Sequence, residues 1–283
     1  MASDPSQHRV WIITGTSQGF GRDLVRVALD RGDRVVATSR DPQKVNSAFP
    51  GSSDWLLALP MDLRDAKQIA GVADAAIKRF GRIDVLVNNA GHGLLGALEE
   101  ANEEEIKNVF EINVFGLIRV TQAVLPHMRK QRSGHIVNLS SIGGLIGIPG
   151  WGCYNATKFA VEGISEALFH ELKPLGIGVT IVEPGPFRTD FLGGSLAMVK
   201  SHIPDYDETA GKTRSYQEEN NGSQAGDPAR AAKAIVDAVT GKNPPLHLLL
   251  GGLAYQRATA KIDALRREFE TWKDVTLATD FPK

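Results

Sequence analysis

The sequence predicts an α/β fold in which a doubly wound parallel sheet of about seven strands carries helices on both faces. Short β-branched and aliphatic runs alternate with longer stretches of helical periodicity, and parallel strands need such crossover helices. The runs are apolar at successive positions, as expected of strands covered on both faces. These strands are Arg9–Thr14, Arg34–Ser39, Trp55–Met61, Ile83–Asn88, His135–Ser140, Val179–Val182 and, after a Pro-Pro pair, Leu246–Leu250.

The predicted helices lie between these strands, and two of them have clear start signals. Asp41-Pro42 and Asp227-Pro228 each join a side chain that caps a helix to a proline suited to its first turn. No change of composition divides the chain before residue 185, so we expect one domain over residues 1–283 with its core in residues 1–185. The helical stretches are Phe20–Asp30, Asp65–Phe80, Glu103–Arg129, Tyr154–Leu172 and Ala229–Val239.

Two segments lie outside this alternation. Residues 186–226 are too long for a structureless loop, and Leu196, Val199 and Ile203 predict a short helix covering a pocket; a mobile surface insertion is the alternative. At the other end, residues 252–275 predict a C-terminal helix that packs its apolar stripe on the body or on another subunit. The stripe consists of Ala258, Ile262, Leu265, Phe269 and Trp272.

Composition indicates a cytoplasmic protein. The net charge of −1 gives no reason to expect nucleic acid or an anionic membrane as a partner. The single cysteine, Cys153, suits a reducing compartment, and its neighbourhood predicts a packing role rather than a nucleophile. The segment Met1–Arg9 lacks the apolar core of a secretion signal, and no run of eighteen apolar residues predicts a membrane span. We expect no metal, since neither a His-Glu-x-x-His motif nor paired cysteines occur.

The first strand runs directly into a glycine-rich segment that opens a helix. Glycines let the backbone turn tightly and approach a pyrophosphate, whose charge meets the N–H groups of the helix N-terminus. Between a strand and a helix, this pattern predicts a dinucleotide site. The expected contacts are Gly15, Ser17, Gln18, Gly19, Phe20 and Gly21.

The glycine spacing, Gly-x-x-x-Gly-x-Gly, resembles that of the short-chain dehydrogenase/reductase family. Three further segments match this family in order, each directly after a predicted strand, so that the resemblance runs from Val10 to about Leu250. It implies a Rossmann-type fold, a nicotinamide cofactor and a hydride transfer to or from a carbonyl carbon. The implied cofactor contacts are Asp62 and Leu63 near the adenine, Asn89, Ala90 and Gly91 of the Asn-Asn-Ala-Gly motif, and Pro184, Gly185 and Thr189 at the nicotinamide.

The end of the second strand favours NADP(H) over NAD(H). An NAD site usually places an acid there, on the ribose 2′-hydroxyl, but this strand ends in Ser39 and Arg40. A guanidinium at this point pairs well with a 2′-phosphate. Asp41 is the competing ribose ligand, although its place before Pro42 favours helix capping.

The segment Tyr154-Asn155-Ala156-Thr157-Lys158 places a phenol and an ammonium on one helix face. A nearby cation is expected to lower the phenol pKa from about 10 toward the working range. By resemblance, Tyr154 is the acid and base, and Lys158 supports it and holds the nicotinamide ribose. Ser141 then polarises the carbonyl, with Ser140 as the alternative serine, and Asn113 holds a water of the proton relay.

The side chains expected around the reacting carbon are mainly apolar, which predicts a small hydrophobic carbonyl or alcohol as substrate. They are His92, Ile142, Gly143, Leu145, Ile148, Trp151, Phe187, Phe191 and Leu192. The long segment after Pro184 and the C-terminal helix resemble the hydroxysteroid- and retinol-dehydrogenase-like branch of the family. His127 and His135 are expected to have no catalytic part.

Two other functions stay open. A sugar-nucleotide epimerase of the extended relatives usually has a Gly-x-x-Gly-x-x-Gly motif and a larger C-terminal domain, which this sequence lacks. A regulator that senses NADP(H) without turnover commonly lacks the tyrosine or the lysine, whereas Tyr154 and Lys158 are both present. The family resemblance also implies a homodimer or homotetramer built through the stretches Glu103–Arg129 and Tyr154–Leu172.

Overall fold

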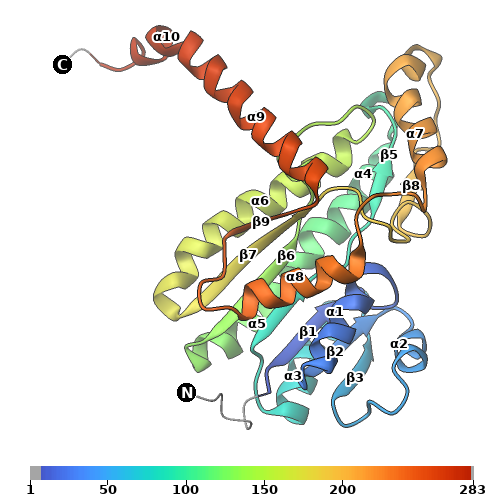
Figure 1. The fold of residues 1–283 in the computed structure, drawn as a ribbon, viewed down its shortest axis with the longest axis vertical. Helices are drawn as coiled ribbons and strands as arrows, with labels where there is room; N and C mark the ends of the chain where they lie inside the picture. The colour runs from blue at the N-terminus through green and yellow to red at the C-terminus, as the bar shows by residue number, and fades with distance from the viewer. Residues whose placement is uncertain (1–7, 282–283) are drawn as a thin grey trace.

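The computed structural model describes residues 8–281, so most of the N-terminal segment Met1–Arg9 used above lies outside the described residues. Seven parallel strands form a sheet in the order β3-β2-β1-β4-β6-β7-β9 (Figure 1). The order reverses between β1 and β4, where the crevice at the carboxyl ends of the strands binds ligands in such sheets. The strands are β1 (Val10–Thr14), β2 (Arg34–Ser39), β3 (Leu56–Pro60), β4 (Val85–Asn88), β6 (Gly134–Leu139), β7 (Ile177–Pro184) and β9 (His247–Leu250).

Helices cover both faces of this sheet, as the alternation predicts. On one face, α1 (Gly19–Asp30), α2 (Pro42–Ala48) and α8 (Pro228–Thr240) share a core with the strands. On the other face, α3 (Ala66–Phe80), α5 (Leu117–Gln131) and α6 (Gly152–Leu172) form the second core. The result is a single-domain Rossmann-type sheet covered on both sides.

Aspartates cap three of these helices. Asp41 accepts a hydrogen bond of 3.1 Å from the N–H of Gln43 at the start of α2, and Asp227 accepts from the second residue of α8 at 2.9 Å. Asp65 caps α3 in the same way. The capping interpretation of Asp41 is therefore confirmed, and this carboxylate is committed to a helix end.

The predicted helix Glu103–Arg129 is divided in the structure. It consists of α4 (Glu103–Phe110), a π-helical turn (Glu111–Gly116) and α5. By length and hydropathy the whole stretch passes the test for a membrane-crossing helix. In this structure, however, α5 packs on α3 and β4, and Val120 and Val124 lie in the core. These contacts are typical of a core helix.

The helix predicted over Leu196, Val199 and Ile203 is wrong. Leu196–Met198 form a strand, β8, which pairs in parallel with β5 (Gly93–Leu95) beside the carboxyl end of β4. The local spacing suits a helix, but an edge of backbone supplied by β5 is available only in the folded chain. Helix α7 (Lys212–Asn220) follows and stands above this small sheet (Figure 1).

The C-terminal helix α9 (Gly252–Thr271) projects away from the body and continues into α10 (Lys273–Leu277) (Figure 1). Ala254 and Ala258 are buried at its root, against the body. Ile262, Phe269 and Trp272 of the predicted stripe are 60 to 67% exposed. The body of its own chain therefore covers only the first part of this stripe.

Candidate active site

The glycine loop after β1 forms a cradle that excludes larger side chains. Gly15 has φ +70°, and a Cβ there would lie 2.9 Å from Ala90 Cα. A Cβ on Gly21 would collide with the carbonyl oxygen of Gly15. Gln18, the N-cap residue of α1, makes no side-chain capping bond, and no acid lies in the first turn of the helix. Since α2, α3 and α8 are all capped by aspartate, the bare N-terminus of α1 fits the phosphates of a dinucleotide.

Asn89 joins the glycine loop to the end of β4. Its Nδ2 donates to the carbonyl oxygens of Thr14 at 2.8 Å and Gly15 at 3.0 Å. In return, Thr14 Oγ1 accepts from the N–H groups of Asn89 at 3.0 Å and Ala90 at 2.9 Å. Thr14 was not among the predicted site residues, although its place at the end of the first strand was visible. These four hydrogen bonds hold the end of β1 against the end of β4, where the strand order of the sheet reverses.

Ser141, Tyr154 and Lys158 come together as predicted. Ser141 lies just after β6 and hydrogen-bonds the Tyr154 phenol. Its Oγ also accepts a hydrogen bond of 3.0 Å from the N–H of Gly143. Lys158 Nζ lies 5.6 Å from the centre of the Tyr154 ring and donates to the carbonyl oxygen of Leu139 at 2.7 Å. All three side chains therefore lie at the carboxyl end of β6.

Ser140 is not the serine of this group. Its hydroxyl donates to Glu162 Oε1, on the far side of the strand from the Tyr154 phenol. Neighbouring residues of an extended strand face opposite sides, and this alternation assigns the role to Ser141.

Asn113 lies in the π-helical turn, and its side chain makes three hydrogen bonds with protein partners. Its Oδ1 accepts from the N–H of His92 at 2.9 Å, and its Nδ2 donates to the carbonyl oxygen of His92 at 2.8 Å and to Thr157 Oγ1 at 3.1 Å. The side chain thus fixes two neighbours, and the water expected at Asn113 stays a prediction. The wider turn, common at functional sites, carries Asn113 toward Gly91 and Lys158.

Burial governs the ionisation of the two central groups. It raises the pKa of Tyr154 to about 12, although the hydrogen bond with Ser141 favours the phenolate. Burial also lowers the pKa of Lys158 to about 8, against the opposing effect of Glu162. In the protein alone, burial outweighs the hydrogen bond with Ser141, and the expectation that Lys158 lowers the phenol pKa stays a prediction.

Ser39 and Arg40 lie at the end of β2, as the sequence predicts. Ser39 is buried, and its Oγ accepts from the N–H of Asp41 at 3.0 Å. Arg40 is exposed, and it forms no ion pair with another residue between 8 and 281. Asp62, expected at the adenine, forms a two-point pair with Arg64 whose shortest N–O distance is 2.6 Å. This hydrogen bonding lowers the pKa of Asp62 to about 2, with a smaller contribution from Arg40.

The remaining cofactor residues occupy different places. Leu63 packs beneath the π-helical turn, where a Cβ on Gly116 would lie 2.8 Å from it. Thr189 lies beside the glycine loop, since a Cβ on Gly19 would come within 3.5 Å of Thr189 Cβ. Gly185 follows Pro184 and lies against Ala254 of α9. The structure thus brings the segment after β7 back to the loop after β1.

Aromatic and aliphatic side chains enclose the Tyr154 ring. Trp151 lies 5.2 Å and Phe191 5.7 Å from it, centre to centre. A Cβ on Gly143 would lie 3.5 Å from the same ring. The other members of this cluster are Ile148 and Leu192, which were predicted, and Leu95 and Leu196, which were not. Leu95 and Leu196 come from β5 and β8, whose pairing the sequence alone did not indicate.

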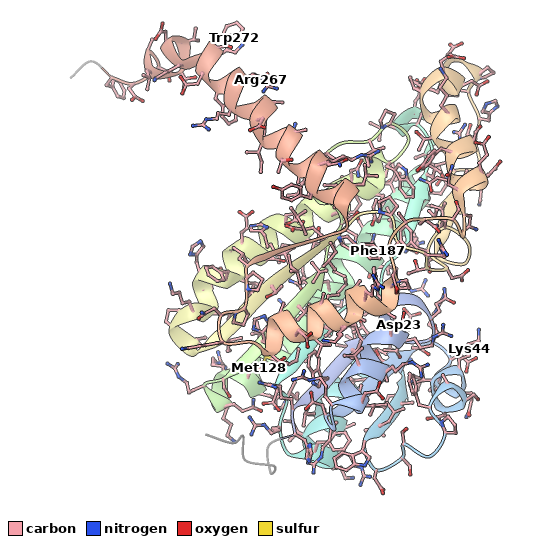
Figure 2. All side chains as sticks on the ribbon, in the orientation of Figure 1. Asp23, Lys44, Met128, Phe187, Arg267 and Trp272 are labelled. Carbon is pink, nitrogen blue, oxygen red and sulfur yellow. The ribbon has the colours of Figure 1, made fainter. Side chains whose placement is uncertain are left out.

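Three predicted pocket residues lie elsewhere. Ile142 and Leu145 pack against Ala254 and Ala258 of α9, because the 3₁₀ turn at Ile142–Gly144 directs them there. Phe187, labelled in Figure 2, packs on Phe20 of the glycine loop with ring centres 5.2 Å apart. His92 is half-buried beside Asn113, and burial lowers its pKa, with Lys158 and Arg40 adding to the effect.

Behind the active site lies an acidic cluster that the sequence did not indicate. Glu162 and Glu183 are both buried, and His247 Nδ1 lies 2.6 Å from Glu183 Oε1 and 4.0 Å from Glu162 Oε2. Burial raises the pKa of Glu162 to about 7 and also raises that of Glu183. These three residues offer ligand atoms within 4.8 Å of one another, which bears on the expectation that the protein has no metal.

Cys153 and His135 have structural surroundings. Burial raises the pKa of the Cys153 thiol, which disfavours the reactive thiolate and agrees with the predicted packing role. Burial also lowers the pKa of His135 to about 4, and its Nε2 lies 2.9 Å from Thr180 Oγ1 in the sheet.

Comparison with known proteins agrees with this architecture. The sequence profile of the short chain dehydrogenases matches residues 9–199. A solved short-chain dehydrogenase from Streptomyces avermitilis is 42% identical and superposes with a TM-score of 0.91, covering 97% of this chain and 100% of the other.

Two characterised relatives are similar over most of their length. The 3-ketodihydrosphingosine reductase of Bacteroides thetaiotaomicron is 38% identical over 87% of this chain and 89% of its own. Human retinol dehydrogenase 8 is 37% identical over 87% of this chain and 81% of its own. With its glycine loop, its tyrosine and lysine on α6 and its parallel sheet, the protein belongs to the short-chain dehydrogenase/reductase family of oxidoreductases.

Proposed function

We propose that this protein is an NADP(H)-dependent oxidoreductase that interconverts a hydrophobic ketone or aldehyde and the corresponding alcohol. The observation that carries the proposal is the buried Tyr154 phenol, bonded to Ser141 among apolar rings. A phenol in this position exchanges a proton only with a group that has entered the same apolar space. NADP(H) bound at the glycine loop would supply or accept the hydride.

The proton steps follow from the pKa values of the site. A Tyr154 pKa of about 12 keeps the phenol protonated at neutral pH, so it is ready to act as the acid in carbonyl reduction. Ser141 donates a hydrogen bond to the substrate oxygen, where negative charge develops. Lys158, with a pKa of about 8, stabilises the phenolate left behind and has further donors for the nicotinamide ribose. Asn113 supports this proton relay by fixing His92 and Thr157.

The preference for NADP(H) rests on Arg40. This exposed guanidinium lies at the end of β2 with no acid of its own to neutralise it among the described residues. The neighbouring Asp41 is engaged at the start of α2, and the acid of a typical NAD site is replaced by the buried Ser39. A 2′-phosphate gains a charge-assisted pair at this position, whereas a free ribose hydroxyl gains nothing comparable.

An apolar substrate body suits the cluster around Tyr154, which includes Trp151, Phe191 and Leu192. The names of two relatives, a 3-ketodihydrosphingosine reductase and a retinol dehydrogenase, point in the same direction. Family members are generally oligomeric, and we include a homodimer or homotetramer in the proposal. We also include a cytoplasmic location, which the lone buried Cys153 supports.

The alternative function is an NADP(H)-sensing protein without turnover. One assay separates the two functions: NADPH and NADH oxidation are followed by absorbance with aryl ketones, apolar aldehydes and a steroid ketone. We expect turnover with NADPH well above that with NADH. Tight NADPH binding without turnover of any compound would favour the sensor.

The assignment of the acid is tested by Tyr154→Phe, with Tyr255→Phe at an exposed position of α9 as the matched control. We expect the first variant to lose turnover by at least about a hundredfold while it still binds NADPH, and the second to keep wild-type rates. Full activity of Tyr154→Phe would refute the mechanism.

A further inference from the structure

Helix α9 exposes a continuous apolar stripe beyond its root. Ala254 and Ala258 pack on the body, but Ile262, Phe269 and Trp272 are 63, 67 and 60% exposed. Figure 2 shows Arg267 and Trp272 on the projecting part of the helix, away from the sheet and its helices. An uncovered stripe of this size on a soluble protein marks an interaction surface.

The spacing of the stripe is that of a coiled-coil seam. Its apolar positions from Tyr255 to Trp272 are separated alternately by three and four residues. This heptad rhythm keeps one face of a helix against a second helix, whereas packing on a sheet or in a membrane interface requires a broader apolar face. The seam residues open to a partner are Tyr255, Ile262, Leu265, Phe269 and Trp272; Ala258 shares the spacing but packs on the body of its own chain.

The charges beside the seam indicate which helix fits. Lys261 and Glu268 directly precede Ile262 and Phe269, so they lie on the same edge of the seam. In an antiparallel pair of identical helices, equivalent edges face each other. Lys261 then meets the partner's Glu268, and the symmetry repeats this attractive contact.

A parallel pair is less favourable because opposite edges meet. Lys261 would then face Arg266 of the partner subunit, a contact between like charges, while Glu268 would face the partner's Lys273. Half of the edge contacts would be repulsive. Lys261 and Glu268 form no ion pair with any other residue of the described range 8–281, so both are available for a partner.

We propose that α9 pairs antiparallel with α9 of a second copy of this chain, about a two-fold axis between Ile262 and Leu265. Ile262 of each copy then packs on Leu265 of the other. Phe269 and Trp272 reach the segment of the partner where its α9 leaves the body. Tyr255, 63% exposed, offers a ring there, whereas Ala258 is covered by its own body.

The pairing is tested by sedimentation of the full-length protein at micromolar concentration. The variants are Lys261→Glu, the charge exchange Lys261→Glu/Glu268→Lys, and Lys242→Glu as a control at an exposed lysine outside α9. We expect Lys261→Glu to raise the dissociation constant by roughly tenfold, because two attractive contacts become repulsive. The double exchange restores both contacts and the wild-type mass, and the control leaves the mass unchanged.

The same variants refute the proposal if it is wrong. In a parallel pair, the Lys261→Glu substitution would place a carboxylate against Arg266 of the partner subunit. The dissociation constant would then fall. If α9 is instead covered by a lipid surface, or by nothing, all three variants and Ile262→Glu have the same mass as the wild-type protein. Because Ile262 is exposed in the monomer, Ile262→Glu is expected to keep the fold, as its circular dichroism and melting temperature will show, while it halves the mass of the assembly.

Discussion

The buried carboxyl of Glu162 makes a sharp prediction about stability. Its side chain lies within α6, with Oε1 bonded to Ser140 and Oε2 without a hydrogen-bond partner among residues 8–281. Burial raises its pKa from 4.5 to about 7, and the neighbouring buried Glu183 adds to this effect while Ser140 and His247 oppose it. Glu162→Gln keeps the shape and the hydrogen bond with Ser140 and removes the charge.

The sign follows from proton binding. The folded protein holds a proton on Glu162 at pH values where the unfolded chain has released it, so stability is highest below about pH 4.5 and declines as the pH rises to about 7. The difference between 4.5 and 7 corresponds to at most about 3 kcal/mol at 1.36 kcal/mol per unit. We therefore expect Glu162→Gln to be more stable than the wild type above pH 7, by about 1–3 kcal/mol, and to lose most of this pH dependence.

Urea unfolding at pH 5 and pH 8 measures both effects. The matched control is Glu171→Gln, an exposed position on the same helix, whose free energy of unfolding should change by less than about 0.5 kcal/mol. Equal pH dependence in wild type and Glu162→Gln would refute the reasoning, as would a destabilised variant at pH 8. Either result would mean that the folded protein already compensates the Glu162 carboxylate.

Three further outcomes are expected. Arg40→Ala should raise the KM for NADPH by about ten- to a hundredfold and leave that for NADH nearly unchanged, while Lys44→Ala in α2 changes neither, as initial rates will show. Arg214→Met leaves the fully buried carboxylate of Glu100 without its ion pair, so limited proteolysis of residues 200–226 should become faster; unchanged cleavage would argue against this anchor. Phe191→Ala removes a ring that covers the phenol and should lower kcat/KM by about tenfold for bulky apolar carbonyls but less for small ones; equal losses would exclude Phe191 from the pocket.

The sequence by itself determined the sheet and the place that most of the predicted site residues take in it. The seven predicted strands all appear in the sheet, and the site residues lie where strands end because parallel strands bring their carboxyl ends to one edge. Tyr154 and Lys158 share a helix face for an equally local reason. The predicted C-terminal helix appears as α9, whereas a core in residues 1–185 and a lid over residues 186–226 stay predictions.

Only the tertiary structure decided which distant segments meet. The strand at Leu196–Met198 forms because β5 offers an edge, and the same contact brings Leu95 and Leu196 to Tyr154. Ile142 turned toward α9, against expectation, because the turn after Ser141 has no periodicity from which its direction can be predicted.

The pKa of Tyr154 was likewise beyond the sequence, since it depends on how much water the fold removes from the phenol. The same holds for the carboxyls of Glu162 and Glu183, which lie 21 positions apart in the chain and meet only across α6 and β7. Local patterns depend on neighbours in the chain and can be read from it. Burial and long-range contacts depend on the whole fold, and so do the charges and the pocket of this site.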